Sequence, residues 1–269
     1  MKKRVVSAIV AIAIVIPLFL LGGIPFAIGV GIVAAIAYYE TLGLKESHKP
    51  YPTLIKVLGF ICLELLVLSR IDASYVYYGP SFGAIAFTIL SLVIPTIFDK
   101  NEKYTTKEAL HLIGNIILIG LFFNLLILLC NGNKWLLLYL ILVGVLTDTF
   151  AMVIGCLIGK HKLIPSVSPK KSVEGSIAGS LVCTIVGSIY YYNVVTNSIN
   201  IFLLIIMTLA LSILGQLGDL FFSKMKRENK IKDFSNIMPG HGGILDRLDS
   251  LSFIVFGYII VISILHLFK

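Results

Sequence analysis

The sequence predicts an all-α, polytopic membrane protein. Of its 269 residues, 58% are hydrophobic and only 13% are charged, and the mean hydropathy is +0.98. A soluble domain carries about 25% charged residues, so a soluble core of this length could not bury so much apolar surface. The four cysteines lie in apolar runs and form no CxxC pair, which argues against a zinc or thiol-redox motif.

Nine stretches of the chain meet the requirement of a membrane helix, which is about 20 mostly apolar residues. They are 4–21, 24–42, 52–70, 79–98, 108–130, 135–158, 174–193, 200–222 and 245–267. The first stretch superficially resembles a signal peptide, but its apolar run is long and no small-x-small cleavage site follows, so we expect it to be retained. No soluble domain fits between the stretches, and we therefore predict one integral membrane domain, 1–269.

The basic residues predict the orientation of these helices, because lysine and arginine concentrate in cytoplasmic loops. With the N-terminus inside and the C-terminus outside, all 22 basic residues except Arg70, Lys134 and Lys269 fall on the cytoplasmic side. The net charge of +8 therefore reflects topology and contact with anionic lipid head groups, not nucleic-acid binding. Both long connections, 159–173 and 223–244, are then cytoplasmic loops at the cell (plasma) membrane, and we expect them to form the active-site face.

Carboxylates inside apolar stretches cost roughly 2.5–3.5 kcal/mol on insertion scales, so they usually face a cavity or a partner. Ser212, Gln216, Asp219 and Ser223 are spaced by four, three and four residues and share one helical face. This stripe fits a hydrogen-bonded seam between helices or the wall of a polar cavity, and the carboxylate favours the cavity. Asp148, between two threonines, is a second candidate for lining that cavity.

Two other acids lie in predicted membrane helices. Glu40 is near the cytoplasmic end of the second stretch, where its carboxylate can reach the surface, and Glu64 has no polar neighbours on its face. The sequence assigns neither a role. A ridge of small residues in the seventh stretch predicts close helix packing; its members are Gly175, Gly179, Cys183 and Gly187.

The segment 223–249, SKMKRENKIKDFSNIMPGHGGILDRLD, combines a basic stretch, a glycine-rich turn and an acid pair. Lysine and arginine suit phosphates, and glycines let backbone N–H groups approach an anion closely. Asp246 and Asp249 could simply complement a helix N-terminus, but one acid would meet that need. Carboxylates also suit Mg²⁺, which prefers a few of them together with substrate phosphates. The combination predicts a metal-bridged phosphate site.

The connection 159–173, GKHKLIPSVSPKKSV, contains four lysines and directly precedes a predicted helix start. Its charge alone fits anchoring to the cytoplasmic surface. Ser168-Pro169-Lys170-Lys171 before a helix N-terminus favours anion binding, because that end of a helix offers free N–H donors. No GxxxxGK[ST] motif is present, so this is not a P-loop.

The segment 223–249 resembles the signature of the phosphatidate cytidylyltransferases (CDP-diacylglycerol synthases). The matching residues are Ser223, Met225, Lys226, Arg227, Lys232, Asp233, Ser235, Pro239, His241, Gly242, Gly243, Ile244, Asp246, Arg247, Leu248 and Asp249. Ser168–Lys171, Glu174 and Gly175 are similar to a second block of that family. The nine-helix layout is similar too, so the resemblance extends along essentially the whole chain.

This resemblance implies the Mg²⁺-dependent reaction of CTP with phosphatidate to CDP-diacylglycerol and pyrophosphate. It also implies a homodimer and a metal centre formed by Asp219 and Asp246. We expect catalytic roles for Asp219, Asp246, Asp249, Lys226, Arg227, Lys232, Asp233, His241 and Arg247. We expect substrate contacts from Ser168, Lys170, Lys171, Glu174, Ser223, Gly242 and Gly243.

Three alternatives are open at this point. The same CTP chemistry could act on an ether or prenyl lipid phosphate, because lipid-facing positions are generically apolar. A secondary transporter would also contain intramembrane acids, but it would be expected to show an internal repeat, and none is convincing here. A scaffold without catalysis would leave the charged cluster unexplained.

Overall fold

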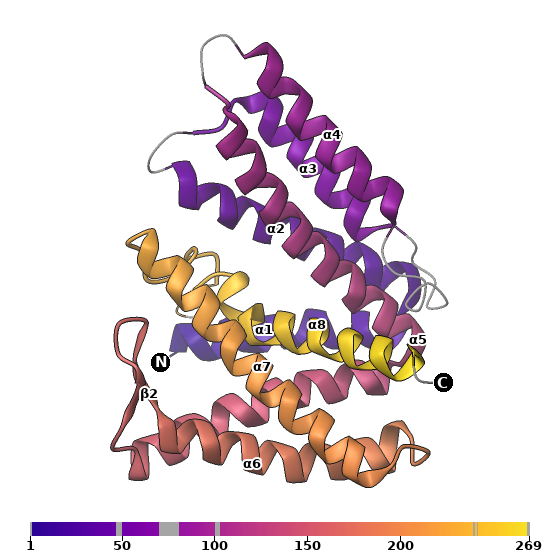
Figure 1. The fold of residues 1–269 in the computed structure, drawn as a ribbon, viewed down its shortest axis with the longest axis vertical. Coiled ribbons are helices and arrows are strands. Elements are labelled where there is room, and N and C mark those ends of the chain that lie inside the picture. Colours follow the sequence, from indigo (N-terminus) through magenta and orange to yellow (C-terminus); the bar gives the residue numbers. More distant parts are fainter. Residues whose placement is uncertain are drawn as a thin grey trace. The chain divides into compact units, whose positions relative to one another are not determined.

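The computed structural model describes residues 2–46, 50–69, 81–99, 103–238, 240 and 242–267, and these are mostly helical (Figure 1). The elements are α1 (Lys2–Leu21), α2 (Gly23–Glu46), α3 (Thr53–Val67), α4 (Phe82–Phe98), α5 (Thr106–Ile158), β1 (Lys162–Ile164), β2 (Ser168–Ser172), α6 (Val173–Tyr190), the π-helical turn η2 (Tyr191–Val195), α7 (Ile201–Glu228) and α8 (Leu245–Leu267). The all-α class is confirmed, with two short strands as an exception.

Within the described part of the chain, five stretches are long and apolar enough to cross a membrane. They are Gly23–Leu44, Thr106–Ile158, Val173–Val195, Ile201–Glu228 and Leu245–Leu265. The protein is thus a multi-pass membrane protein, while the number of nine crossings and the orientation of the termini stay predictions.

Helix α5 is interrupted at Asn133, which has non-helical backbone angles of φ −153° and ψ 98°. Its side-chain oxygen accepts hydrogen bonds from the backbone N–H groups of Trp135 and Leu136, at 3.0 and 3.3 Å. Asn133 therefore acts as the N-cap of the second half of α5. The break falls between the predicted stretches 108–130 and 135–158, where the sequence places a turn.

The connection 159–173 is not the irregular loop that the sequence predicted, because β1 and β2 pair there as an antiparallel hairpin. Pro165 follows Ile164 at the turn, where its fixed φ suits the second position of a β-turn. The turn closes with a hydrogen bond from Val167 N to Ile164 O at 3.2 Å. Ser172 then caps α6 by accepting a hydrogen bond from Gly175 N at 3.2 Å.

The predicted loop 223–244 is also shorter than expected, because α7 continues to Glu228. Lys226 and Arg227 lie in its last turn, where cations interact favourably with the helix dipole. The helix ends at Asn229, and Lys230 adopts the left-handed conformation with φ 56°. Ser223, Lys226 and Arg227 therefore project from a helix and have fixed relative positions, which a loop would not give them.

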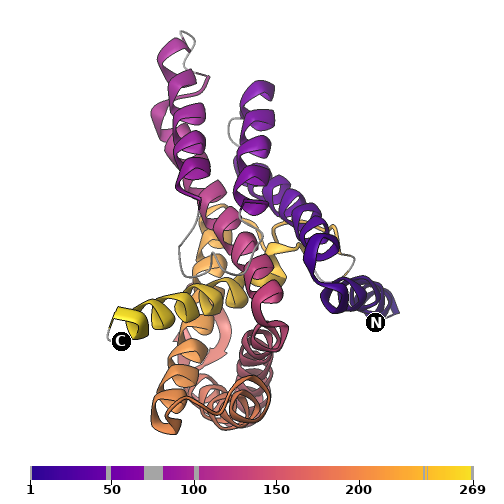
Figure 2. The same ribbon diagram turned by 90° about the vertical axis from the view of Figure 1, so that its right-hand side faces the viewer.

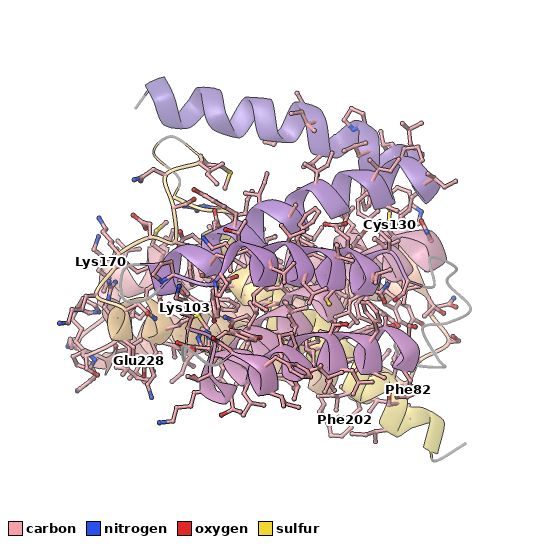
Figure 3. All side chains as sticks on the ribbon, turned by 90° about the horizontal axis from the view of Figure 1, so that it is seen from above. Phe82, Lys103, Cys130, Lys170, Phe202 and Glu228 are labelled. Atoms are coloured by element: carbon pink, nitrogen blue, oxygen red, sulfur yellow. The ribbon has the colours of Figure 1, made fainter. Side chains whose placement is uncertain are left out.

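The chain forms two compact units. Unit 1 contains Met1–Gly132 and Asp233–Leu245, and unit 2 contains Asn133–Lys232 and Asp246–Lys269. In unit 1, α3 packs against α2 and α4, and in unit 2, α6 packs against α7 (Figures 1 and 2). Figure 3 shows that Lys170 and Glu228 lie at one end of unit 2 and Phe202 lies at the other. The hairpin and the charged end of α7 thus share one end of that unit.

The ridge of small residues on α6 packs closely against its neighbours, as the sequence predicted. A Cβ atom on Gly179 would lie 2.6 Å from the carbonyl oxygen of Thr147 in α5. A Cβ atom on Gly187 would lie 3.0 Å from Cγ2 of Thr208 in α7. The backbone approach at Gly179 leaves no room for a Cβ atom, and the contact at Gly187 is tight, so the ridge holds α6 close to both helices.

The polar stripe on α7 divides into two parts. Ser212 bonds to Thr147 at 2.8 Å and to Ser180 at 3.0 Å, and Gln216 Nε2 donates to Ser180 Oγ at 2.7 Å. Ser212 therefore belongs to the helix–helix seam, whereas Gln216 both joins the seam and lines a cavity with Ser176 and Ser180. Asp219, farther along the same face, belongs to a different set of contacts.

The packing of α6 predicts that Gly179→Ala destabilises the protein. In a helix interior, alanine is more stabilising than glycine by about 1 kcal/mol. Forcing an extra methyl group into a tightly packed contact, however, costs about 1–3 kcal/mol. The matched control is Gly114→Ala in α5, where no described atom lies within 4 Å of the new Cβ. We expect a lower melting temperature in detergent for Gly179→Ala and an unchanged or higher one for Gly114→Ala; equal melting temperatures would contradict the close packing.

Candidate active site

Three carboxylates from three helices gather in unit 2. Asp148 of α5, Asp219 of α7 and Asp249 of α8 lie close enough to interact electrostatically. Ser250 contacts two of them: its hydroxyl donates to Asp148 Oδ2 at 3.0 Å, and its N–H donates to Asp249 Oδ1 at 2.8 Å. Neighbouring carboxylates repel one another when ionised, and either a proton or a cation relieves that repulsion, which makes the cluster the centre of the candidate site.

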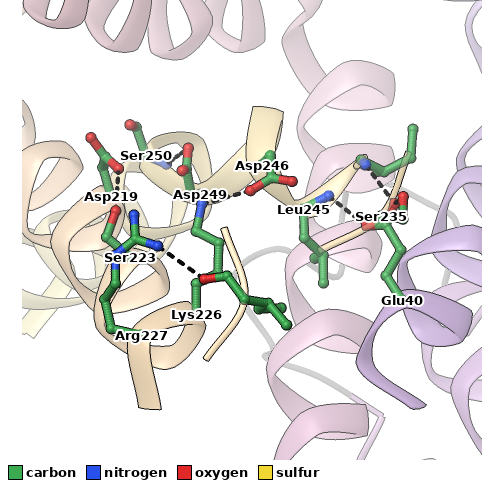
Figure 4. Close-up of polar contacts among 12 residues, drawn as sticks. Glu40, Asp219, Ser223, Lys226, Arg227, Ser235, Leu245, Asp246, Asp249 and Ser250 are labelled. Atoms are coloured by element: carbon green, nitrogen blue, oxygen red, sulfur yellow. Dashed lines mark hydrogen bonds and ion pairs between the residues drawn. The ribbon is translucent and has the colours of Figure 1, made fainter. Parts of the chain in front are cut away.

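Asp219 of α7 contacts a lysine of the β1–β2 hairpin. Lys171, from strand β2, forms an ion pair with Asp219 Oδ2, and both side chains are about 23% exposed. Ser223, one turn later on α7, donates to Asp219 Oδ1 at 3.2 Å (Figure 4). These contacts join the 159–173 connection to α7, the helix that leads into the segment 223–249, and the expected two-part substrate site stays a prediction.

Asp246, the other predicted metal ligand, also has a lysine partner. Lys226 Nζ lies 2.6 Å from Asp246 Oδ1, and the two side chains are only 9% and 5% exposed (Figure 4). Opposite charges attract strongly in such a low-dielectric setting, but each is costly without the other. The pair joins the end of α7 to the first turn of α8.

Glu174 holds the base of the hairpin. Its carboxylate accepts hydrogen bonds from the backbone N–H groups of Lys160 and His161 at 3.1 Å, and it lies 2.6 Å from His161 Nδ1. We predicted a substrate contact here, and the described structure shows a contact that orients the strand carrying Ser168, Lys170 and Lys171. Lys170 is exposed beside the paired Lys171.

The glycine-rich turn belongs to unit 1. Met238 and Gly242 exchange two backbone hydrogen bonds, at 3.0 and 3.2 Å, which close a tight loop. Gly242 has φ +84°, in the left-handed region that glycine adopts readily. Gly243 packs against the carboxylate of Glu40. The predicted role of His241 lies outside the described residues.

The other predicted residues lie at the charged end of the signature segment. Arg227 Nη1 donates to the carbonyl oxygen of Ile231 at 2.9 Å and so stabilises the turn after α7. Lys232, Asp233 and Arg247 are exposed. Their predicted contacts with a substrate stay predictions.

The carboxylates of unit 2 offer hard oxygen atoms, the kind of donor that divalent cations prefer. Among the residues that the structure describes, no group of three or more His, Cys, Asp or Glu side chains is arranged to hold a metal ion alone. Mg²⁺ does not need such a cage, since it binds one or two carboxylates and completes its shell with phosphate oxygens and water. Asp219, with Asp249 and Asp148 nearby, offers hard oxygen donors whose charge Lys171 partly neutralises.

The profile of the cytidylyltransferase family matches residues 2–265, nearly the whole chain. The chain belongs to the cytidylyltransferase family. It is 36% identical over 260 residues to a phosphatidate cytidylyltransferase of Staphylococcus haemolyticus (strain JCSC1435), an alignment that covers 95% of this chain and 96% of the relative. The phosphatidate cytidylyltransferase of Staphylococcus aureus (strain COL) is 35% identical over 258 residues, with the same coverage.

In this cytidylyltransferase-family chain, sequence reasoning assigned roles to most of the charged residues but none to Glu40. The structure shows that Glu40 accepts hydrogen bonds from Ser235, Ile244 and Leu245, which lie 195–205 positions later in the sequence. We call the part of the chain from Ser235 to Leu245 the signature loop. A lone glutamate near the end of an apolar helix gives no local signal of such partners. Asp148 was proposed from its polar neighbours, and the structure brings it near Asp219 and Asp249.

The buried pair predicts that Lys226→Met is strongly destabilising, since it leaves the carboxylate of Asp246 without its ammonium partner. The expected loss is about 3–5 kcal/mol of unfolding free energy. Lys224→Met is the matched control on the same helix. Its pair with Glu228 is long, at 3.8 Å, and both side chains are mostly exposed, so it should cost at most about 1 kcal/mol. Unfolding in denaturant, followed by tyrosine fluorescence, measures both; similar losses would contradict the assigned burial.

Proposed function

We propose that this protein transfers the cytidylyl group of CTP to phosphatidate, giving CDP-diacylglycerol and pyrophosphate. The proposal is supported by similarity along 95% of the chain to relatives named phosphatidate cytidylyltransferase. The structural observation that carries it is the ion pair between Lys171 of the hairpin and Asp219 of α7. Cations and carboxylates in one place suit two phosphate substrates and a bridging metal.

The reaction needs little covalent help from the protein. The phosphate of phosphatidate is a monoester whose second pKa is about 6, so one of its oxygens is already a nucleophile near pH 7. That oxygen attacks the α-phosphorus of CTP, the bond from this phosphorus to the β-phosphate oxygen breaks, and pyrophosphate leaves with the electron pair. The main barrier is the repulsion between two polyanions, so positioning and positive charge supply most of the catalysis.

The lysines and arginines of the site supply that positive charge. Lys171 and Lys226 sit beside Asp219 and Asp246 and can turn to phosphate oxygens when a substrate enters. Arg227, Lys232 and Arg247 stabilise charge on the leaving pyrophosphate. Lys170 and Lys171 hold the nucleotide, and His241 donates to a phosphate oxygen.

Mg²⁺ is the proposed cofactor. Asp219 and Asp246 would hold it, with Asp249 close to Asp219. When bound, the ion supplies the charge that neutralises and aligns the two phosphates.

We further propose the arrangement in the cell. The protein crosses the plasma membrane nine times, with its N-terminus inside and its C-terminus outside, and it works as a homodimer. The active site then faces the cytoplasm, where CTP is available, while phosphatidate enters from the lipid. The distribution of basic residues supports this orientation.

One assay tests the function. Purified protein in detergent micelles receives labelled CTP, Mg²⁺ and either phosphatidate, a prenyl phosphate or an ether-lipid phosphate. We expect CDP-diacylglycerol and pyrophosphate in equal amounts from phosphatidate. Turnover with only another lipid phosphate would replace the substrate, and no liponucleotide with any lipid would overturn the proposal.

The proposed metal site predicts that Asp219→Asn lowers kcat by at least about 100-fold, the effect typical of losing one preorganised electrostatic contact. Asparagine keeps the size of the side chain but removes the charge that binds Lys171 and the ion. Glu228→Gln, at the exposed end of the same helix, is the matched control and should keep normal turnover. Activity at saturating CTP over a range of Mg²⁺ concentrations checks this; full activity of Asp219→Asn would remove Asp219 from the metal site.

A further inference from the structure

The buried carboxylate of Glu40 in α2 accepts three hydrogen bonds from the signature loop. Glu40 is 1% exposed, although it stands near the end of an apolar helix. Its Oε1 accepts hydrogen bonds from Ser235 Oγ at 2.6 Å and from Ile244 N at 2.8 Å. Its Oε2 accepts one from Leu245 N at 2.9 Å (Figure 4). All of these residues belong to unit 1.

This contact does not fit an acid that merely reaches the membrane surface. A buried charge is costly unless donors surround it, and hydrogen bonds to an ionised group are roughly twice as strong as neutral ones. The loop is also shaped around the carboxylate, because any Cβ atom at position 243 would overlap the side-chain oxygens of Glu40. Gly243 and Glu40 therefore form a matched pair.

The hydrogen bonds to Glu40 come from both sides of the turn between Met238 and Gly242. Ser235 lies before the tight turn that Met238 and Gly242 close, and Ile244 and Leu245 lie after it. Leu245 is the first residue of α8, and the N–H groups of a first helical turn have no acceptor within their own helix. Glu40, which is distant in the sequence, supplies an acceptor for the Leu245 N–H, and it also places negative charge at the N-terminal end of α8. The next residue along the chain is Asp246.

We propose that Glu40 is a positioning residue for cytidylyl transfer. It ties down both sides of the glycine-rich loop, so that the loop keeps the geometry that the phosphates require. Glu40 does not itself contact the substrates. The inference rests on the proposed function for its catalytic consequence, while the tether itself can be tested without any reaction.

The first experiment measures the tether by hydrogen–deuterium exchange of the purified protein. Glutamine at position 40 keeps the size of the side chain but turns an NH₂ group toward one of the donors. In Glu40→Gln we expect the amides of Ile244 and Leu245 to exchange at least about 10-fold faster than in the wild type. Glu64→Gln is the matched control, an identical change in α3 of unit 1 at a carboxyl that packs near Gly31. Unchanged exchange in Glu40→Gln would overturn the tether.

The second experiment measures the catalytic consequence. A displacement of about 1 Å can cost about 100-fold in rate, so we expect a 10- to 100-fold lower kcat for Glu40→Gln and normal turnover for Glu64→Gln. Glu40→Asp, which keeps the charge, should recover part of the loss. Faster exchange at the loop with an unchanged kcat would reduce Glu40 to an anchor and overturn the positioning role.

Ser235→Ala keeps the test decisive if Glu40→Gln does not fold. It removes one donor and leaves the carboxylate in place, so exchange at Ile244 and kcat should shift in the same directions by a smaller factor. In the Glu40→Gln background it should add little, because the two residues share one contact. If even the wild type makes no liponucleotide, the proposed function fails, and the exchange data still decide the tether.

Discussion

The constraint on which this structure depends is that a charged group in an apolar chain must find its partner within the protein. Asp219 finds Lys171, Asp246 finds Lys226, and Glu40 finds one hydroxyl and two backbone N–H groups. Each contact joins segments that are distant in the sequence. The same contacts that make these acids tolerable therefore also order the carboxylates of unit 2 and, separately, the glycine-rich loop of unit 1.

The paired lysines explain how a site for two polyanionic substrates can be stable while it is empty. Without substrates, the ammonium groups neutralise the carboxylates, so no isolated charge stands in a low-dielectric environment. Phosphates and a divalent cation would exchange these partners without creating unpaired charge. The groups that stabilise the resting protein and the groups that serve the proposed reaction are thus the same.

Hydrophobic pattern and local chemistry were enough to predict the helices, the break near Asn133 and the ridge around Gly179. They missed the hairpin, because Lys162–Ile164 and Ser168–Ser172 are short and the second contains a proline and two lysines. They also ended α7 too early, since its last turn is charged and lies beyond the apolar stretch. A rise in charged residues along the sequence indicates where the chain leaves the membrane, but it does not indicate where the helix ends.

The site was predictable in its chemistry but not in its pairings. The cations and acids of 223–249 indicated phosphate and metal, which stays a prediction, and no pattern in the sequence showed that Lys171 pairs with Asp219. Glu40 shows the limit of this reasoning, because the identity of its partners depends on tertiary structure alone. The interval of 195–205 residues between them has a consequence for synthesis. At about 5–20 residues per second, a ribosome needs about 10–40 s to deliver those partners after Glu40 has emerged. Unit 1 therefore cannot be completed until its last segment, Asp233–Leu245, has been made, although most of it is made first.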